Sequence, residues 1–219
     1  MKTDRLKVLD RDAVKYIAIF VMFWGHLFAW VTLMRNPDAD TAYPLMPLWM
    51  RIVTHFSIFC PPVMFFFIAD GYKYTRDRKK YALRLCLFAL IAQLPYDMAF
   101  SDSGNPFEFV GLNMLFTLFF CFLILLARDR IQNRALRVGA IILLFLLCVI
   151  SDWFIMAPLF TLLFSRARKG KMPYFAAYFI SILTFVVIMG MMNLTTISIP
   201  MALYSTLLGA AVMSVSGLT

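Results

Sequence analysis

Blocks of about 20 apolar residues, separated by short polar loops, are the feature that most limits how this chain can fold. A bilayer core about 30 Å thick requires apolar helices of roughly this length. The chain has 219 residues, 62% of them hydrophobic, and a mean hydropathy of +0.79. A soluble domain is closer to 45–50% apolar. The pattern therefore predicts an all-α integral membrane protein with a single polytopic domain over residues 1–219.

The positions of the apolar blocks predict a bundle of about eight membrane helices. The second block contains Pro61-Pro62, where the loss of backbone hydrogen bonds should kink or break the helix. The third carries Gln93 and Pro95 near its far end. The expected spans are residues 14–34, 48–69, 81–99, 109–127, 173–192 and 198–215, with two more inside 135–164.

The stretch 135–164 is 30 residues long, which is too much for one upright span. It is interrupted by Ser151-Asp152-Trp153, and basic clusters flank both of its ends. A single span would place these clusters on opposite sides of the membrane, whereas a hairpin places them on the same side. We therefore predict two short helices, with Asp152 at the outer surface.

The distribution of basic residues orients the chain. Under the eight-helix map, 19 of the 21 lysines and arginines fall at the N-terminus or in loops on one side. Arg35 and Arg51 fall on the other side. Because loops rich in Lys and Arg stay in the cytoplasm, both ends of this chain are expected to be cytoplasmic. The same rule accounts for the net charge of +9 without a nucleic-acid partner.

The four cysteines, Cys60, Cys86, Cys121 and Cys148, all lie within apolar blocks. Their spacing does not match that of metal ligands, so we interpret them as packing residues and predict no metal site.

The first apolar block carries Lys15 near its start and His26 near its middle. Eleven steps of 100° bring them to within about 20° of one face, roughly 16 Å apart along the axis. An ionisable residue inside a membrane span points to function by default. There is an alternative without a function. The ammonium group of Lys15 extends to the lipid headgroups, and His26 hydrogen-bonds a neighbouring helix.

Basic residues also gather where the second block ends. Asp70 should reach the level of Lys15, because the second helix runs opposite to the first. Such a cluster suits a phosphate-bearing ligand from the cytosol. Topology control together with anionic lipid would explain most of the same charges. The candidate binding residues are Asp70, Lys73, Arg76, Arg78, Lys79, Lys80 and Arg84.

Three further polar residues, Gln93, Asn113 and Thr117, lie in the outer half of the predicted bundle, and His55 enters the second helix from that side. For each of them, hydrogen bonding between helices is the simpler interpretation.

Several segments together resemble the TraX family, whose named member N-acetylates the pilin of a conjugative plasmid. The specific block is PVMFFFIADGYKYTR at residues 62–76, flanked by LDRDAVKYIA at 9–18 and KYALRL at 80–85. NMLFTL at 113–118 and SDW at 151–153 add weaker matches. The likeness covers most of residues 9–165.

The spacing of Lys15 and His26 also resembles the helix-1 signature of acyltransferase-3-type membrane acyltransferases. The resemblance implies that His26 is the catalytic histidine, that Lys15 is its basic partner, and that cytosolic acetyl-CoA is the donor. Gly25 stands where such proteins often have an aspartate. Family members also continue past Thr219 into a last helix, so we expect this chain to lack that C-terminal helix.

Taken together, the sequence favours a multi-pass acetyltransferase of the bacterial cytoplasmic membrane. It would move an acetyl or other acyl group from acetyl-CoA to an amine or hydroxyl of a protein or glycan, such as the N-terminus of a pilin-like protein. The alternative is a small transporter or a non-catalytic membrane partner. A transporter would favour paired carboxylates within the membrane, whereas Asp70, Asp97 and Asp152 all lie at predicted helix ends.

Overall fold

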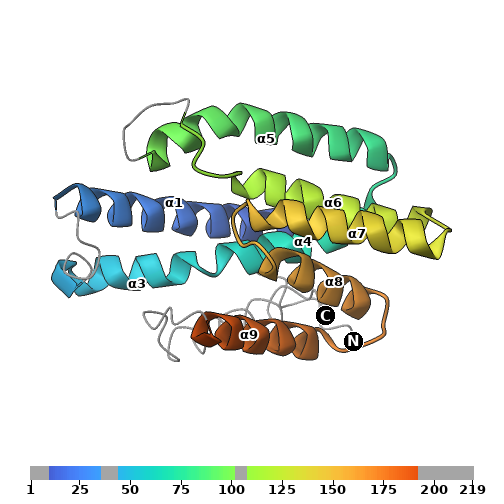
Figure 1. The fold of residues 1–219 in the computed structure, drawn as a ribbon. Coiled ribbons are helices and arrows are strands. Elements are labelled where there is room, and N and C mark those ends of the chain that lie inside the picture. Colours follow the sequence, from blue (N-terminus) through green and yellow to red (C-terminus); the bar gives the residue numbers. More distant parts are fainter. Residues whose placement is uncertain (1–9, 36–43, 102–107, 192–219) are drawn as a thin grey trace. The chain divides into compact units, whose positions relative to one another are not determined.

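The computed structural model describes residues 10–35, 44–101 and 108–191, and every regular element in these ranges is an α-helix (Figure 1). The expected span 198–215 lies outside the described residues. The chain divides into two compact units, residues 1–64 with 178–219, and residues 65–177. The helices are α1 (Arg11–Arg35), α3 (Leu48–Ser57), α4 (Cys60–Tyr74), α5 (Arg78–Phe100), α6 (Met114–Arg130), α7 (Arg134–Val149), α8 (Met156–Arg168) and α9 (Tyr174–Met191).

Three helical stretches are long and apolar enough to cross a bilayer. They are α1 with 25 residues, the nearly continuous stretch Leu48–Tyr74 with 27, and α5 with 23. At 1.5 Å per residue each exceeds a hydrocarbon core of about 30 Å. Large apolar side chains such as Phe20, Phe23 and Phe88 are exposed on them, as lipid-facing residues would be. The helical, membrane-type composition predicted from the sequence is thus confirmed in its broad form.

The second predicted helix is broken where the prolines suggested. α3 ends at Ser57 and α4 begins at Cys60, immediately before Pro61-Pro62. Proline has no backbone N–H and its ring clashes with the preceding turn, but it is tolerated in the first turn of a helix. The two prolines therefore start α4 rather than interrupt it.

In the second unit, α6 is the central helix and packs against α5, α7 and α8 (Figure 1). Its side chains supply much of the core, including Phe122, Ile124 and Leu125, which are fully buried. Cys121 is buried on the same helix, and Cys60 and Cys148 are buried as well, all as free thiols. The interpretation of the cysteines as packing residues is confirmed for these three, whereas Cys86 is half-buried.

The break predicted at Ser151-Asp152-Trp153 is confirmed, because α7 ends at Val149 and α8 begins at Met156. The backbone of the break is paired with an extended segment before α6. Leu112 N donates to Ile150 O at 2.8 Å, and Asp152 N donates to Leu112 O at 3.1 Å. Trp153 has a φ of 62°, a rare conformation for a bulky residue.

The predicted start of the fourth span at residue 109 was wrong, because α6 begins only at Met114. The reason is Asn113, whose side-chain oxygen accepts hydrogen bonds from Leu115 N and Phe116 N and so caps the helix. Its amide also donates to Ala89 O at 2.8 Å and to the Gln93 side chain at 3.0 Å. These bonds fasten the extended segment to α5.

We expect Asn113→Ala to lower the free energy of unfolding by about 2–3 kcal/mol, since it removes a helix cap and the two hydrogen bonds from Asn113 to α5. Thermal unfolding of the purified protein in detergent would measure this. Asn133 is the matched control, because it caps α7 from an exposed position through one bond to Leu136 N. Asn133→Ala should cost about 1 kcal/mol or less. Equal losses in the two variants would contradict a special role for Asn113.

Candidate functional site

The predicted catalytic pair lies on α1, in the first unit. Val14, Ala18 and Gly25 are the buried residues of this helix, which packs against α3. Lys15 and His26 each follow one of these residues by a single position, so both lie about 100° away from the packing seam. Lys15 is half-buried and its Nζ contacts Asp12 Oδ1 at 2.9 Å, whereas His26 is exposed. The helix places the two residues on nearly the same face, about three turns apart.

Gly25 is fixed by the contact between α1 and α3. A Cβ atom at this position would overlap the side chain of Ser57, which in turn donates to Thr54 O at 2.6 Å. Any residue larger than glycine would have to push the two helices apart. The structure therefore gives a packing reason for the absence of an aspartate before His26, separate from the chemistry of the histidine.

Asp70 lies at the end of α4, in the second unit, and is only 5% exposed. Its Oδ1 contacts Arg168 Nη2 at 2.7 Å, and Arg168 donates further hydrogen bonds to the hydroxyls of Tyr74 and Tyr174. Asp70 thereby joins the end of α4 to the end of α8. This ion pair gives Asp70 a structural partner, and a carboxylate in this position would repel rather than hold a phosphate.

The other predicted binding residues surround the start of α5. Arg78 stacks on Tyr72 and donates to its hydroxyl at 3.0 Å. Asp77 caps α5 by accepting from Lys80 N, and this hydrogen bond holds the pKa of Asp77 below its usual value. Lys73 Nζ reaches Arg168 O at 3.5 Å. The remaining members of the set, Arg76, Lys79, Lys80 and Arg84, are exposed.

Gln93, Asn113 and Thr117, the polar residues predicted for the outer half, form a structural network. Gln93 donates to Asp97 at 2.9 Å and to Gly111 O at 2.6 Å, and accepts from Asn113. Thr117 is fully buried and donates to Asp152 O at 2.8 Å. These bonds connect α5, α6 and the break between α7 and α8, as expected for hydrogen bonding between helices.

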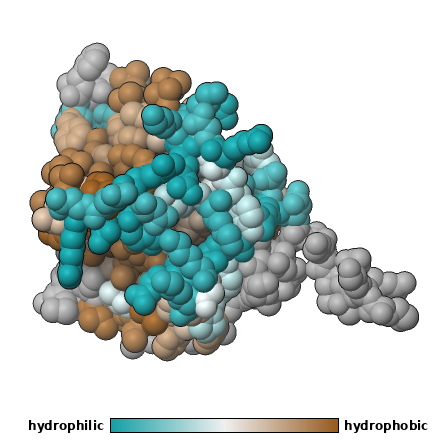
Figure 2. Space-filling view, turned by 90° about the vertical axis from the view of Figure 1, so that its right-hand side faces the viewer, coloured by the Kyte–Doolittle hydropathy of each residue, from teal (hydrophilic) through white to brown (hydrophobic). Residues whose placement is uncertain are grey.

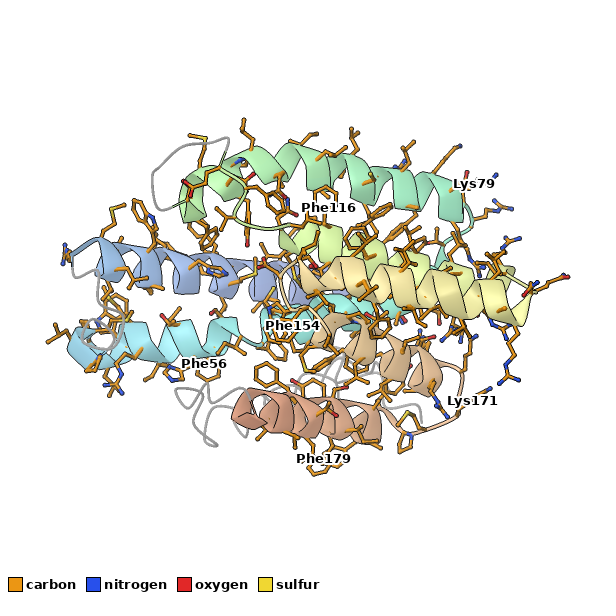
Figure 3. The ribbon with its side chains drawn as sticks, viewed as in Figure 1. Phe56, Lys79, Phe116, Phe154, Lys171 and Phe179 are labelled. Carbon is orange, nitrogen blue, oxygen red and sulfur yellow. The ribbon has the colours of Figure 1, made fainter. Side chains whose placement is uncertain are left out.

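A pocket of about 450 Å³ lies between the ends of α6 and α8. Polar side chains gather on the face shown in Figure 2, and Figure 3 places Lys79 and Lys171 of the second unit on that side. Partial burial tends to raise the pKa of Asp129, but hydrogen bonds and positive charges from Arg128 and Lys169 outweigh it and lower this pKa. The pocket is lined by Arg128, Asp129, Leu162, Arg166, Lys169 and Lys171.

Comparison with known families identifies the chain. A family model described as "TraX protein" matches residues 10–218, nearly the whole sequence. This chain belongs to the TraX family. No solved structure matches it.

One curated relative of this TraX-family chain is the probable fimbrial assembly protein FimC, serogroup H1, of Dichelobacter nodosus. The two sequences are 30% identical over 173 residues, which is 77% of this chain and 66% of the relative. The chain thus spans just under two thirds of the relative's length.

Sequence reasoning singled out the helix-1 pair of this TraX-family chain as candidates and did not point to the pocket or to Arg168. Arg128, Arg166, Lys169 and Lys171 were counted only as charges that set topology. The available signal was Asp129, a carboxylate set between Arg128 and Arg130. A single acidic residue inside a basic loop suggests that it forms ion pairs with some of the nearby basic side chains and fixes their positions. Among the described residues, no three His, Cys, Asp or Glu side chains group as metal ligands.

Proposed function

We propose that this chain is a membrane-embedded acyltransferase that moves an acetyl or related acyl group from cytosolic acyl-CoA to an amine or hydroxyl acceptor. The family match over residues 10–218 carries the proposal. The placement of Lys15 and His26 on one face of a helix long enough to span a membrane supports the proposal. This face carries both a proton acceptor and a positive charge.

The proposed chemistry is direct acyl transfer. The acceptor nitrogen or oxygen attacks the thioester carbonyl, the carbon–sulfur bond breaks, and the CoA thiolate leaves and is protonated. His26 would take the proton that the acceptor loses, and Lys15, about three helical turns away, would hold negative charge on the donor. A transient acyl-histidine is the covalent alternative. The relative's name, a fimbrial assembly protein, supports a protein acceptor of the fimbrial or pilin kind.

We also propose eight spans in the bacterial cytoplasmic membrane, with the N-terminus in the cytoplasm. Two observations support this arrangement. Nineteen of the 21 basic residues fall on one side of the map. In the second unit, contacts such as Lys169 to Asp129 and Arg128 to Ser165 gather the basic ends of α6 and α8 together.

A transfer assay in sealed membrane vesicles tests activity and orientation together. Acetyl-CoA is highly charged and does not cross a bilayer, so it reaches only the outward-facing side of a vesicle. We expect inverted vesicles to transfer labelled acetyl groups to a peptide with a free N-terminal amine. Right-side-out vesicles should do so only after they are permeabilised. Transfer in intact right-side-out vesicles alone would reverse the orientation, and no transfer in either preparation would refute the proposed activity.

A further inference from the structure

The pocket between the ends of α6 and α8 has a strong surplus of positive charge. Four of the six residues that line it are basic, Asp129 is its one acid, and Leu162 gives it an apolar wall. Its volume of about 450 Å³ lies within the usual range for small-molecule sites. The opening therefore suits a ligand larger than a single phosphate ion.

Part of this positive charge is held in fixed positions. Asp129 Oδ1 contacts Arg128 Nε at 3.1 Å and Lys169 Nζ at 3.3 Å. Arg128 also donates from Nη2 to Ser165 Oγ at 2.9 Å, which ties α6 to α8. A ligand that meets these cations finds them already oriented, so it loses less entropy on binding than it would with free side chains.

The backbone at the end of α8 brings Lys169 and Lys171 to the same opening. Gly170 N donates to Ala167 O at 2.9 Å and Lys171 N donates to Arg166 O at 3.1 Å, which is the Schellman pattern of helix termination. Gly170 has a φ of +71°, which glycine adopts without strain. The turn folds the chain back, so that Arg166 and Lys171, joined by this backbone hydrogen bond, both line the pocket.

Arg166 and Lys171 are exposed, and within the described part of the chain neither side chain forms an ion pair. Their charge is thus available to an incoming anion. Arginine and lysine together bind phosphate groups through charge-assisted hydrogen bonds.

We propose that this pocket binds the phosphate-rich nucleotide part of the acyl donor, with Arg166 and Lys171 as the main phosphate contacts. The identity of the donor as an acyl-CoA rests on the proposed function, whereas the phosphate chemistry rests on the pocket. Leu162 offers an apolar surface against which a base can pack. This assignment differs from the set around the start of α5 that the sequence suggested.

The test is equilibrium binding of coenzyme A and of inorganic pyrophosphate to the full chain in nanodiscs of neutral lipid. The variant Arg166→Gln/Lys171→Gln should raise the Kd for both probes by at least about tenfold, since charge-assisted hydrogen bonds are lost. The control Arg130→Gln/Arg134→Gln removes the same charge from exposed residues outside the pocket. It should change each Kd by less than about threefold, as expected for weak, screened charges.

Equal effects of the two double variants, or none for Arg166→Gln/Lys171→Gln, would overturn the proposal.

A second arm adds anionic lipid to the nanodiscs. If anionic lipid abolishes the difference in coenzyme A Kd between the wild type and Arg166→Gln/Lys171→Gln, the pocket holds lipid headgroups in a membrane and the nucleotide assignment fails. If coenzyme A binds as proposed but no acyl transfer occurs, the pocket stands and the proposed function falls. If transfer occurs while the pocket variant binds normally, the pocket assignment alone is wrong.

Discussion

His26→Ala should lower the rate of acyl transfer by about 10²–10⁴-fold while leaving the protein folded and inserted. This is the usual contribution of a positioned general base, because without it the acceptor must lose its proton to water. The fold should persist because His26 lies outside the seam of Val14, Ala18 and Gly25. Initial rates with labelled acetyl-CoA at saturating donor would give the effect on kcat.

The control for this variant is His55→Ala. His55 is part of α3 and its Nδ1 hydrogen-bonds Arg51 O at 2.6 Å, a contact within one turn of its own helix. It should retain transfer within about threefold, since a surface or local hydrogen bond rarely moves an activity by more than this when the fold is kept. If His26→Ala turns over like the wild type, the catalytic assignment of this histidine is wrong.

Much of the helical arrangement could be predicted because lipid and proline impose strong local rules. The lengths of the apolar blocks predicted where α1 and α5 lie, and Pro61-Pro62 predicted the start of α4. The polar triplet that begins at Ser151 predicted the break between α7 and α8. The start of α6 could not be predicted from hydropathy. Residues 109–112 are nearly as apolar as the helix, and the capping bonds of Asn113 decide where the helix begins.

The site was less predictable because it depends on partners that are distant in the sequence. Asp70 and Arg168 lie almost a hundred positions apart, and Asp129 meets Lys169 from another helix. The positive-inside rule places such charges on one side of the membrane but does not say which of them pair. Pairing is what distinguishes the half-buried Arg168 from the exposed Arg166, although only Ala167 lies between them.

Asp70→Ala should lower the free energy of unfolding by about 3 kcal/mol. Removing one partner of a buried ion pair typically costs 3–5 kcal/mol, because the other charge is left uncompensated. The side chains of Asp70 and Arg168 are 7% and 14% exposed, so little water can replace the carboxylate. The hydroxyls of Tyr74 and Tyr174 still accept from Arg168, which places the effect at the low end of the range. Reversible unfolding in mixed micelles would measure the change.

The matched control is Asp129→Ala, the same substitution in an ion pair whose side chains are 24% and 25% exposed. It should cost less than about 1 kcal/mol, since solvent screens such pairs.

A third variant, Asp70→Leu/Arg168→Met, removes both charges and keeps most of the volume. It should recover a large part of the loss, because a buried pair replaced by apolar groups is often neutral. If Asp70→Ala unfolds like the wild type, the contact does not hold α4 to α8. If the double variant is as unstable as the single one, the cost comes from lost hydrogen bonds to the tyrosines rather than from an unpaired charge.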